Sequence, residues 1–382
     1  MQRLIGCAQN YVWGSRTMLS SLRGDGPSDL PEAEIWYGAH AVAPSTFDDG
    51  TTLLAAIDAD ATAQVGPENV AMFGRRLPFL LKLLAAASPL SLQAHPTADQ
   101  AIAGFADDEA EGIARDAAHR IFRDDNHKPE LIVAVTPFEA LVGFRDPVRS
   151  VALLDALAAP DGLVSLVAGE GPKAAMKWLL DPKTSAHRNA VAACISALVA
   201  GATNYVGDTW MAEAALVLRL TAMYPADPGI GVAALLNLVE LEPGEGLFLG
   251  AGTLHSYVSG LGVEVLANSD NVVRGGLTQK HVDVPTLITV VRPDCIDPTP
   301  VDLVAGQYST SVPEFRLTRI TPAGATPVTG PAIVLCVSGT TRLSGNDQLE
   351  LTPTEAAWIP TGETVGASTS DLGFVAEVGD LA

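Results

Sequence analysis

A change of hydrophobic periodicity inside the chain limits the possible folds more than any other feature. From about residue 148 to residue 230, Ala- and Leu-rich segments repeat apolar residues at the 3.6-residue spacing of helices, and Pro and Gly separate them. On both sides of this block, apolar runs of strand length are bounded by Gly and Pro. The pattern predicts a mainly β protein that carries a helical insertion of four or five helices.

Before the insertion, strand-like and helix-like segments alternate. The strand-like segments are 77–87, 90–95, 130–135 and 139–144, and the helix-like segments are 51–66 and 98–122. Strand-like composition returns at about residue 233 and continues to the C-terminus. We therefore expect three units, formed by 1–147 with 231–290, by 148–230, and by 291–382.

Composition excludes several classes of function. The 382 residues carry a net charge of −21, which argues against nucleic acid as a partner. No apolar stretch reaches the roughly 20 residues of a membrane span, and the first residues lack the apolar region of a secretory signal. The cysteines are far apart and form no C-x-x-C pair. We expect a cytoplasmic protein with reduced thiols and no membrane partner.

The segment "SLQAHP" places Gln93 and His95 two residues apart at the end of an apolar run. On a strand these residues share one face, and an apolar strand has little use for a paired amide and imidazole unless both face something polar. Glu130 opens another predicted strand, and His255 follows a Gly-rich turn into a third. Each histidine alone is more often a hydrogen-bonded structural residue. Together, two imidazoles, a carboxylate and an amide oxygen suit zinc.

A second polar constellation spans residues 262–284, "GVEVLANSDNVVRGGLTQKHVDV". Glu264 alternates with apolar residues on a predicted strand, and Arg274 precedes two glycines that permit unusual backbone angles. The alternative is a solvated surface turn. The strand pattern around Glu264 argues against that alternative, and Glu264 lies either on a wet face of the strand or points into a pocket.

The chain also contains a weak internal repeat. Residues 241–255 align without gaps on residues 351–365, with four identities, and His255 aligns with Val365. The alignment suggests two related β units, of which only the first has a possible metal ligand at this position.

These motifs together resemble one family. The resemblance rests on "NYVWG", "AEIWYGAH", "LPFLLKLLAAASPLSLQAHP", "NHKPELIVAVTPFEALVGF", "PGEGLFLGAGTLHSYVSG" and "ANSDNVVRGGLTQKHVDV". In order and separation, they closely resemble the type I mannose-6-phosphate isomerases. The resemblance implies a zinc-dependent catalytic domain with a cupin-type β-barrel (jelly roll), followed by an α-helical domain and a second, degenerate cupin-like β domain.

The implied activity is interconversion of mannose 6-phosphate and fructose 6-phosphate through a cis-enediol(ate), a step of carbohydrate metabolism related to GDP-mannose biosynthesis. One Zn²⁺ per chain, a small sugar-phosphate substrate and a monomeric enzyme are implied as well. The zinc ligands carried over by the resemblance are Gln93, His95, Glu130 and His255. After "QAHP", family members often continue with Asp-Lys, whereas this chain continues with "TAD", which puts a basic contact at the pocket rim in doubt.

The reaction needs a base, stabilisation of a developing oxyanion and a grip on the phosphate. We expect Arg274 to stabilise the oxyanion, with phosphate binding by its planar fork as the alternative. The base candidates are Glu264, Lys128 and His95. Glu264 needs the smallest adjustment of its pKa, and zinc would occupy the basic nitrogen of His95. The remaining candidates, for contacts to sugar or phosphate, are Ser91, Lys82, Tyr257 and Lys280.

Two other functions stay open on the residues alone. One is a different metal-dependent cupin enzyme, such as an iron dioxygenase, which a Gln ligand and a basic pocket fit less well. The other is a cupin that binds a sugar phosphate without catalysis, which would not require an acid–base group beside the metal.

Overall fold

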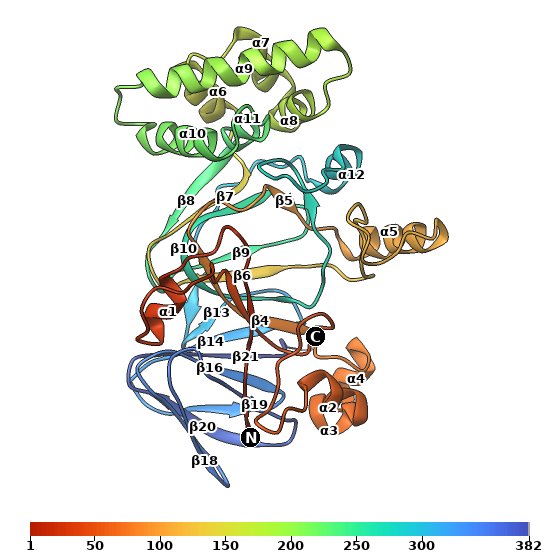
Figure 1. Ribbon diagram of the computed structural model, residues 1–382, viewed down its shortest axis with the longest axis vertical. Helices are drawn as coiled ribbons and strands as arrows, with labels where there is room; N and C mark the ends of the chain where they lie inside the picture. Colours follow the sequence, from red (N-terminus) through yellow and green to blue (C-terminus); the bar gives the residue numbers. More distant parts are fainter. Residues whose placement is uncertain (381–382) are drawn as a thin grey trace.

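The molecule is elongated, and its secondary structure is segregated along the long axis (Figure 1). In this computed structural model, which describes residues 1–380, helices occupy one end, a ten-stranded sheet lies in the middle, and C-terminal strands occupy the other end. Across the described part of the chain, no helix has both the length and the apolar composition needed to span a bilayer. The architecture is mixed α and β, with several antiparallel sheets.

The central sheet carries every strand predicted before the insertion. Its strands are β2 (Cys7–Gln9), β3 (Glu34–Tyr37), β4 (Phe79–Ala86), β5 (Gln93–Ala94), β6 (Glu130–Ala134), β7 (Phe138–Phe144), β8 (Leu236–Leu241), β9 (Gly246–Leu249), β10 (His255–Ala267) and β11 (Val273–Arg274). The predicted strand 90–95 is shorter than expected, because only two of its residues form ladder pairs, with β10 and β11.

Strand β10 organises this sheet. Its first half pairs with β5 and β7, and its second half pairs with β4 and β6. Gly260 lies at this change of partners with φ of 124°, and a Cβ there would lie 2.7 Å from Phe138 Cδ2. The position therefore requires glycine for both its backbone angle and its close approach. Through β10, four strands that precede the helical insertion are brought side by side.

The two faces of the sheet have different chemistry. Leu83 and Val263 lie opposite each other and enter a hydrophobic core that also contains Trp358 of the C-terminal strands. Lys82 and Glu264, each one residue away, point to the other face because successive side chains alternate. One face of the sheet thus packs in a hydrophobic core shared with the C-terminal strands, and the other face presents charged groups to the candidate site.

The helices at the other end pack on the edge of this sheet. They are α6 (Pro147–Ala156), α7 (Asp161–Glu170), α8 (Pro172–Leu180), α9 (Ser185–Asn204), α10 (Met211–Met223) and α11 (Gly229–Ala233). Asp146 begins the block, since its carboxylate accepts hydrogen bonds from the Val148 and Arg149 amides at the start of α6. The apolar faces share one core with Leu92 and Val258 of the central sheet region.

The remaining helices lie outside this block. They are α1 (Met18–Leu22), α2 (Leu53–Ala59), α3 (Ala61–Val65), α4 (Pro67–Phe73), α5 (Ala98–Ala110) and α12 (Val284–Val290). Two predicted helices need correction. The predicted helix 51–66 is divided at Asp60, whose carboxylate caps α3 by accepting from the Ala63 amide. The predicted helix 98–122 ends with α5, because Gly112 adopts φ of 69° and the chain then continues as a loop.

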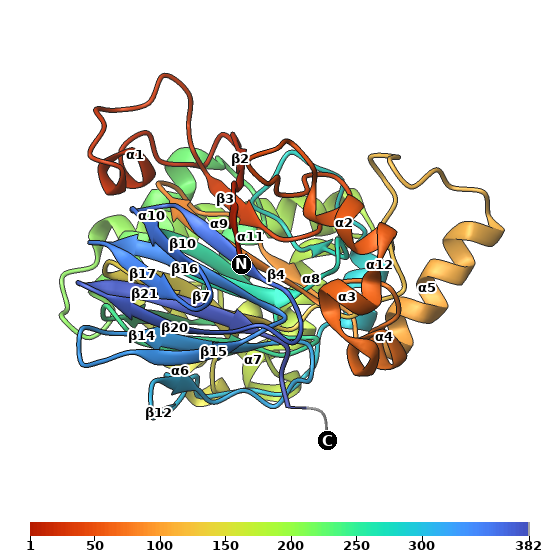
Figure 2. The ribbon, with the colours of Figure 1, turned by 90° about the horizontal axis from the view of Figure 1, so that it is seen from below.

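The C-terminal strands form two further antiparallel sheets, gathered beside α2, α3 and α4 (Figures 1 and 2). The seven-stranded sheet contains β1 (Gln2–Leu4), β12 (Leu303–Val304), β13 (Gln307–Tyr308), β14 (Arg316–Ile320), β16 (Ala332–Ser338), β19 (Ala356–Ile359) and β21 (Leu372–Glu377). The four-stranded sheet contains β15 (Thr326–Thr329), β17 (Thr341–Ser344), β18 (Gln348–Leu351) and β20 (Thr364–Thr369). Val365 is buried in the apolar core between these two sheets. The first strand of the chain, β1, pairs with β19 and so lies in the seven-stranded sheet.

Candidate metal centre

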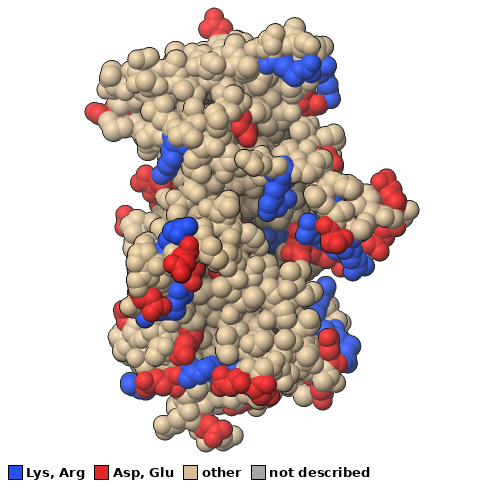
Figure 3. All heavy atoms as spheres, viewed as in Figure 1, with Lys and Arg blue, Asp and Glu red and all other residues tan. Residues whose placement is uncertain are grey.

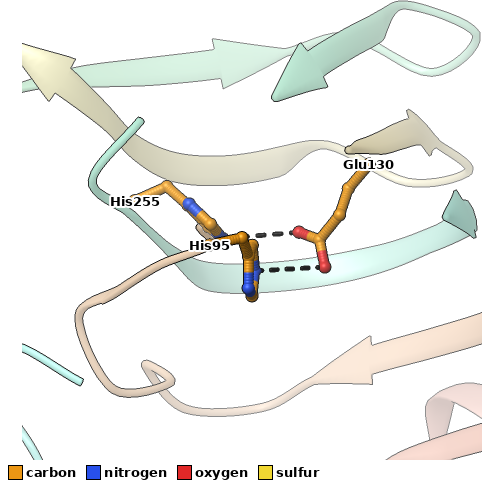
Figure 4. A group of neighbouring side chains, drawn as sticks. All are labelled: His95, Glu130 and His255. Carbon is orange, nitrogen blue, oxygen red and sulfur yellow. Dashed lines mark ion pairs between the residues drawn. The ribbon is translucent and has the colours of Figure 1, made fainter. Parts of the chain in front are cut away.

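His95, Glu130 and His255 converge in the central sheet (Figure 4). One donor atom of each side chain lies within 4.8 Å of the other two. His95 Nε2 is 3.3 Å from Glu130 Oε1, and His255 Nε2 is 3.4 Å from Glu130 Oε2. All three residues are at most 2% exposed. Two imidazoles and a carboxylate that meet out of contact with water form a donor set typical of zinc.

The strands and one turn fix these three positions. Glu130 begins β6 and His255 begins β10, so both side chains stand at strand ends. His95 follows β5, and its carbonyl oxygen accepts a hydrogen bond of 2.8 Å from the Gly252 amide. Gly252, with φ of 77°, forms the turn that leads into His255. The two histidine segments are therefore tied together by the backbone.

Each histidine is oriented through its other ring nitrogen. His95 Nδ1 lies 2.6 Å from the Asn271 carbonyl oxygen, and His255 Nδ1 lies 2.9 Å from the Thr253 carbonyl oxygen. A carbonyl only accepts, so both Nδ1 atoms carry hydrogen, and in the neutral form of each ring Nε2 is the nitrogen with the lone pair. The two Nε2 atoms and Glu130 Oε2 are buried without a hydrogen-bond partner. Unpartnered buried acceptors are costly, and a divalent cation would satisfy all three at once.

The protonation states also fit a metal. Burial lowers the pKa of His95 to about 4, although the Glu130 carboxylate opposes this effect. Burial works against ionisation of Glu130, but Lys128 and His95 hold its pKa well below the ordinary value. His95 is therefore a neutral imidazole and Glu130 an ionised carboxylate, which are the forms that bind metal.

Gln93 lies on β5, between His255 on the neighbouring strand β10 and Arg274 on the neighbouring strand β11. It is directly opposite His255 in the β5–β10 pairing and directly opposite Arg274 in the β5–β11 pairing. Opposite residues in antiparallel strands project to the same face of the sheet. This register places Gln93 beside His255 and makes its side-chain amide the candidate fourth donor.

A buried charge network lies on the same face of the sheet. Lys82 Nζ is 3.1 Å from Glu264 Oε2 and 3.4 Å from Glu34 Oε1. Burial disfavours the Lys82 ammonium, yet Glu34 and Glu264 raise its pKa above the ordinary value. Burial raises the pKa of Glu264, an effect that Lys82 partly offsets. Trp36 completes the network, because its Nε1 donates to Glu34 Oε2 at 2.7 Å and its ring lies 5.1 Å from Lys82 Nζ.

Lys128 and Tyr257, the two remaining buried candidates, lie close to the candidate metal donors. Lys128 Nζ is 3.1 Å from Glu130 Oε1, so its ammonium pairs with a predicted metal ligand. Tyr257 is buried two residues after His255, with ring centroids 6.1 Å apart. Burial, together with the nearby Glu264 and Glu130 carboxylates, raises the pKa of Tyr257 well above the ordinary value.

Three candidates lie on a more open side of the site. Ser91 is two residues before Gln93 and partly buried, and the amide of the next residue, Leu92, donates to the Gly276 carbonyl oxygen. Arg274 is partly buried, whereas Lys280 is exposed, with Nζ 5.7 Å from the centroid of the Tyr11 ring.

Sequence reasoning missed several neighbours of the site. Glu34 and Tyr11 lie inside motifs used for the family resemblance, but nothing local indicates that they reach the charged face. Arg123 directly follows the predicted helix 98–122, and the structure places it on the loop after α5. A His40–Asp270 pair, with Nε2 3.3 Å from Oδ1, also borders the site. All of these depend on register between distant strands or on loop geometry.

Comparisons with known proteins agree over the whole chain. A family model described as the catalytic domain of type I phosphomannose isomerase matches residues 1–147. The mannose-6-phosphate isomerase of Escherichia coli (strain K12) is 36% identical over 387 residues, covering 95% of this chain and 96% of that protein. The mannose-6-phosphate isomerase of Bos taurus is 30% identical and covers 92% of this chain and 89% of its own length.

Solved structures match equally well. A zinc-bound mannose 6-phosphate isomerase has a TM-score of 0.88 and 34% identity, with 99% of both chains covered. The Salmonella typhimurium enzyme, solved with its substrate fructose 6-phosphate and zinc, also has a TM-score of 0.88 and 34% identity, with 100% of both chains covered. Agreement of this extent in sequence and fold shows that the chain belongs to the type I phosphomannose isomerase family.

Proposed function

We propose that this chain catalyses the zinc-dependent interconversion of mannose 6-phosphate and fructose 6-phosphate by moving a proton between C1 and C2 of the sugar. The observation that carries the proposal is the buried cluster of His95, Glu130 and His255, with unpartnered donor atoms. The substrate follows from the relatives, which bear this activity in their names over nearly the full length of the chain.

His95, Glu130 and His255 hold the zinc, and Gln93 is the fourth ligand. Support comes from the protonation states of His95 and Glu130 and from the register of Gln93 with His255. When bound, zinc supplies a positive charge that polarises or orients the sugar oxygens. Everything else the reaction needs must come from side chains of this chain.

Glu264 is the base that transfers the proton. Its buried carboxylate binds a proton more strongly than an exposed glutamate does, because burial raises its pKa. Lys82 lies 3.1 Å away and keeps the carboxylate oriented and ionised in the resting site. Lys128 is the alternative base, but its Nζ lies 3.1 Å from Glu130 Oε1 and is therefore engaged with a proposed zinc ligand.

The transition state carries more negative charge on the sugar oxygens than the substrate does. Arg274 stabilises this charge, since it lies opposite the proposed ligand Gln93 and has a permanent cation. Lys280 and Ser91, on the open side of the site, contact phosphate or sugar, and Tyr257 forms part of the buried wall.

We also infer that the central sheet is the curved wall of a cupin-type barrel, interrupted by the helical insertion and followed by a second, degenerate cupin-like unit. Support comes from β10, which pairs with strands on both sides along its length. Further support comes from Val365, which fills the core of the second unit where the repeat aligns with His255.

A coupled assay that supplies mannose 6-phosphate and detects fructose 6-phosphate tests the activity directly. The protein is assayed as purified, after chelation to a measured zinc content near zero, and after zinc is restored. We expect turnover to be lost and then recovered. Full turnover by the metal-free protein would exclude the zinc dependence. Sugar-phosphate binding without turnover by the zinc-loaded protein would instead identify a non-catalytic cupin.

A further inference from the structure

Basic side chains gather at one hollow of a strongly acidic molecule. The net charge is −21, yet Arg123, Arg274 and Lys280 come together beside the candidate site. Burial lowers the pKa of Lys280, and Arg274 and Arg123 lower it further. Burial followed by Arg123 lowers the pKa of Arg274. Arg123 and Arg274 thus act electrostatically on Lys280. Figure 3 shows basic and acidic side chains around a hollow beside α5.

No carboxylate within the described residues forms an ion pair with any of these three cations. The nearest acids have other partners, since Asp270 contacts His40 and Glu34 contacts Lys82. Cations kept together without acidic partners favour an anionic ligand of high charge.

Arg123 reaches this space from a loop that is clamped in place. Asn271 is fully buried, and its Oδ1 accepts from the Arg123 amide at 2.7 Å and the Asp124 amide at 3.3 Å. Its Nδ2 donates to the carbonyl oxygens of Asp124 at 2.8 Å and Asn126 at 2.9 Å. In return, the Asp124 carboxylate accepts from the Ser269 hydroxyl at 2.8 Å. The loop that carries Arg123 is thus bonded to the polar loop before Arg274.

The same asparagine also fixes this loop relative to the metal ligands. The carbonyl oxygen of Asn271 accepts the hydrogen bond from His95 Nδ1 at 2.6 Å. One residue therefore holds the Arg123 loop with its side chain and orients a predicted zinc ligand with its backbone. The backbone that carries Arg123 is therefore fixed relative to His95 rather than lying on a free loop.

We propose that Arg123 is a specificity residue that binds the phosphate group of the substrate together with Lys280, on the side of Arg274 away from the metal donors. The proposal rests on the proposed function. A phosphate dianion offers several acceptor oxygens, so it matches a planar guanidinium and a second cation better than a single carboxylate would. The segment directly after His95 offers no cation, since Thr97 caps α5 and Asp99 is acidic. Arg123, on the loop after α5, supplies the positive charge that the segment after His95 lacks.

The test compares Arg123→Gln with a matched control, Arg115→Gln. Arg115 lies on the same connecting segment, is 66% exposed and pairs with Glu109. For Arg123→Gln we expect the KM for mannose 6-phosphate to rise about tenfold, with kcat within about twofold and zinc content unchanged. Arg123→Lys should recover part of the loss. Arg115→Gln should match the parent protein.

Binding of inorganic phosphate, measured by calorimetry on the zinc-loaded protein, separates this inference from the proposed function. We expect its affinity to fall about tenfold in Arg123→Gln and to stay constant in Arg115→Gln, whether or not the parent protein turns over mannose 6-phosphate. Equal phosphate affinity in parent and Arg123→Gln would overturn the assignment. A fall in kcat and zinc content with an unchanged KM would overturn it as well, because Arg123 would then be structural.

Discussion

Glu264 and Lys82 lie directly opposite each other on β10 and β4, with Lys82 Nζ 3.1 Å from Glu264 Oε2. Both residues are buried, and Glu34 lies 3.4 Å from the same ammonium. One cation therefore balances two carboxylates in a region closed to water. Removing that cation affects both the stability of the fold and the readiness of Glu264 to accept a proton.

Lys82→Met leaves two buried carboxylates without their counter-ion. We expect a loss of about 3–5 kcal/mol in the free energy of unfolding, measured in urea. Lys82 lowers the pKa of Glu264, so its removal raises that pKa further. Glu264 must be ionised to act as a base, so the decline of kcat/KM on the acidic side should move to higher pH. Lys177→Met, on the exposed side of α8, is the control and should change neither property.

Asn271→Ala removes the side-chain clamp between the Arg123 loop and the backbone that orients His95. We expect zinc affinity to fall about tenfold or more, as for other residues that orient a metal ligand. Competition with a chromogenic chelator measures the affinity. Asn204→Ala is the control, because Asn204 also donates to a backbone oxygen, at 2.8 Å, but is exposed on α9. Unchanged zinc affinity in a folded Asn271→Ala protein would contradict this role.

His255→Ala should abolish stoichiometric zinc binding and turnover, because one of the converging donors is lost. His187→Ala should keep both, since His187 lies in the helical block, where its Nε2 is 2.9 Å from the Trp178 carbonyl oxygen. Elemental analysis should find one zinc per parent chain, because Val365 occupies the aligned position of the C-terminal unit. A second specific zinc beside Val365 would refute that stoichiometry.

Arg274→Met retains most of the stem and removes the charge. If Arg274 stabilises the transition state, kcat should fall by about 10²–10³, or roughly 3–4 kcal/mol, with a smaller change in KM. Arg274→Lys should recover only part of the rate. Steady-state kinetics on the zinc-loaded variants provide the measurement. A steep rise in KM with kcat within a few-fold of the parent would assign Arg274 to phosphate binding alone.

The candidate donors could be recognised in the sequence because their signals are local, and the family resemblance joined them into one set. Gln93 and His95 have strand spacing at the end of an apolar run, and His255 follows a glycine turn. Glu264 is recognisable as a charged residue alternating with apolar ones. Each of these patterns is contained within a few residues, so no knowledge of tertiary pairing is needed to find it.

The surroundings of the cluster could not be predicted in this way. Glu34 meets Lys82 only through the register of β3 with β4, and the Arg123 loop is tied to the loop before Arg274 through the side chain of Asn271. The alanine-rich sequence 98–122 favours a helix throughout, but Gly112 ends it and releases the loop that carries Arg123. The pairing of two distant segments produces no periodic pattern in the sequence of either segment, so it cannot be predicted from local sequence.

The pairing of β10 has a consequence for the order in which the protein can assemble during synthesis. Strands β4, β5, β6 and β7 leave the ribosome before the helices of residues 147–233, yet each of them pairs with β10, which follows those helices. The helical block has mostly local contacts and can fold while the earlier strands still lack a common partner. His255 is the first residue of β10, so the third proposed zinc donor arrives with the strand that completes the sheet. The candidate metal site is therefore completed late in biosynthesis. A chain arrested before residue 255 can form the β3–β4, β6–β9 and β7–β8 pairs, but it leaves one edge of β4, β6 and β7 without β10 and lacks the third donor.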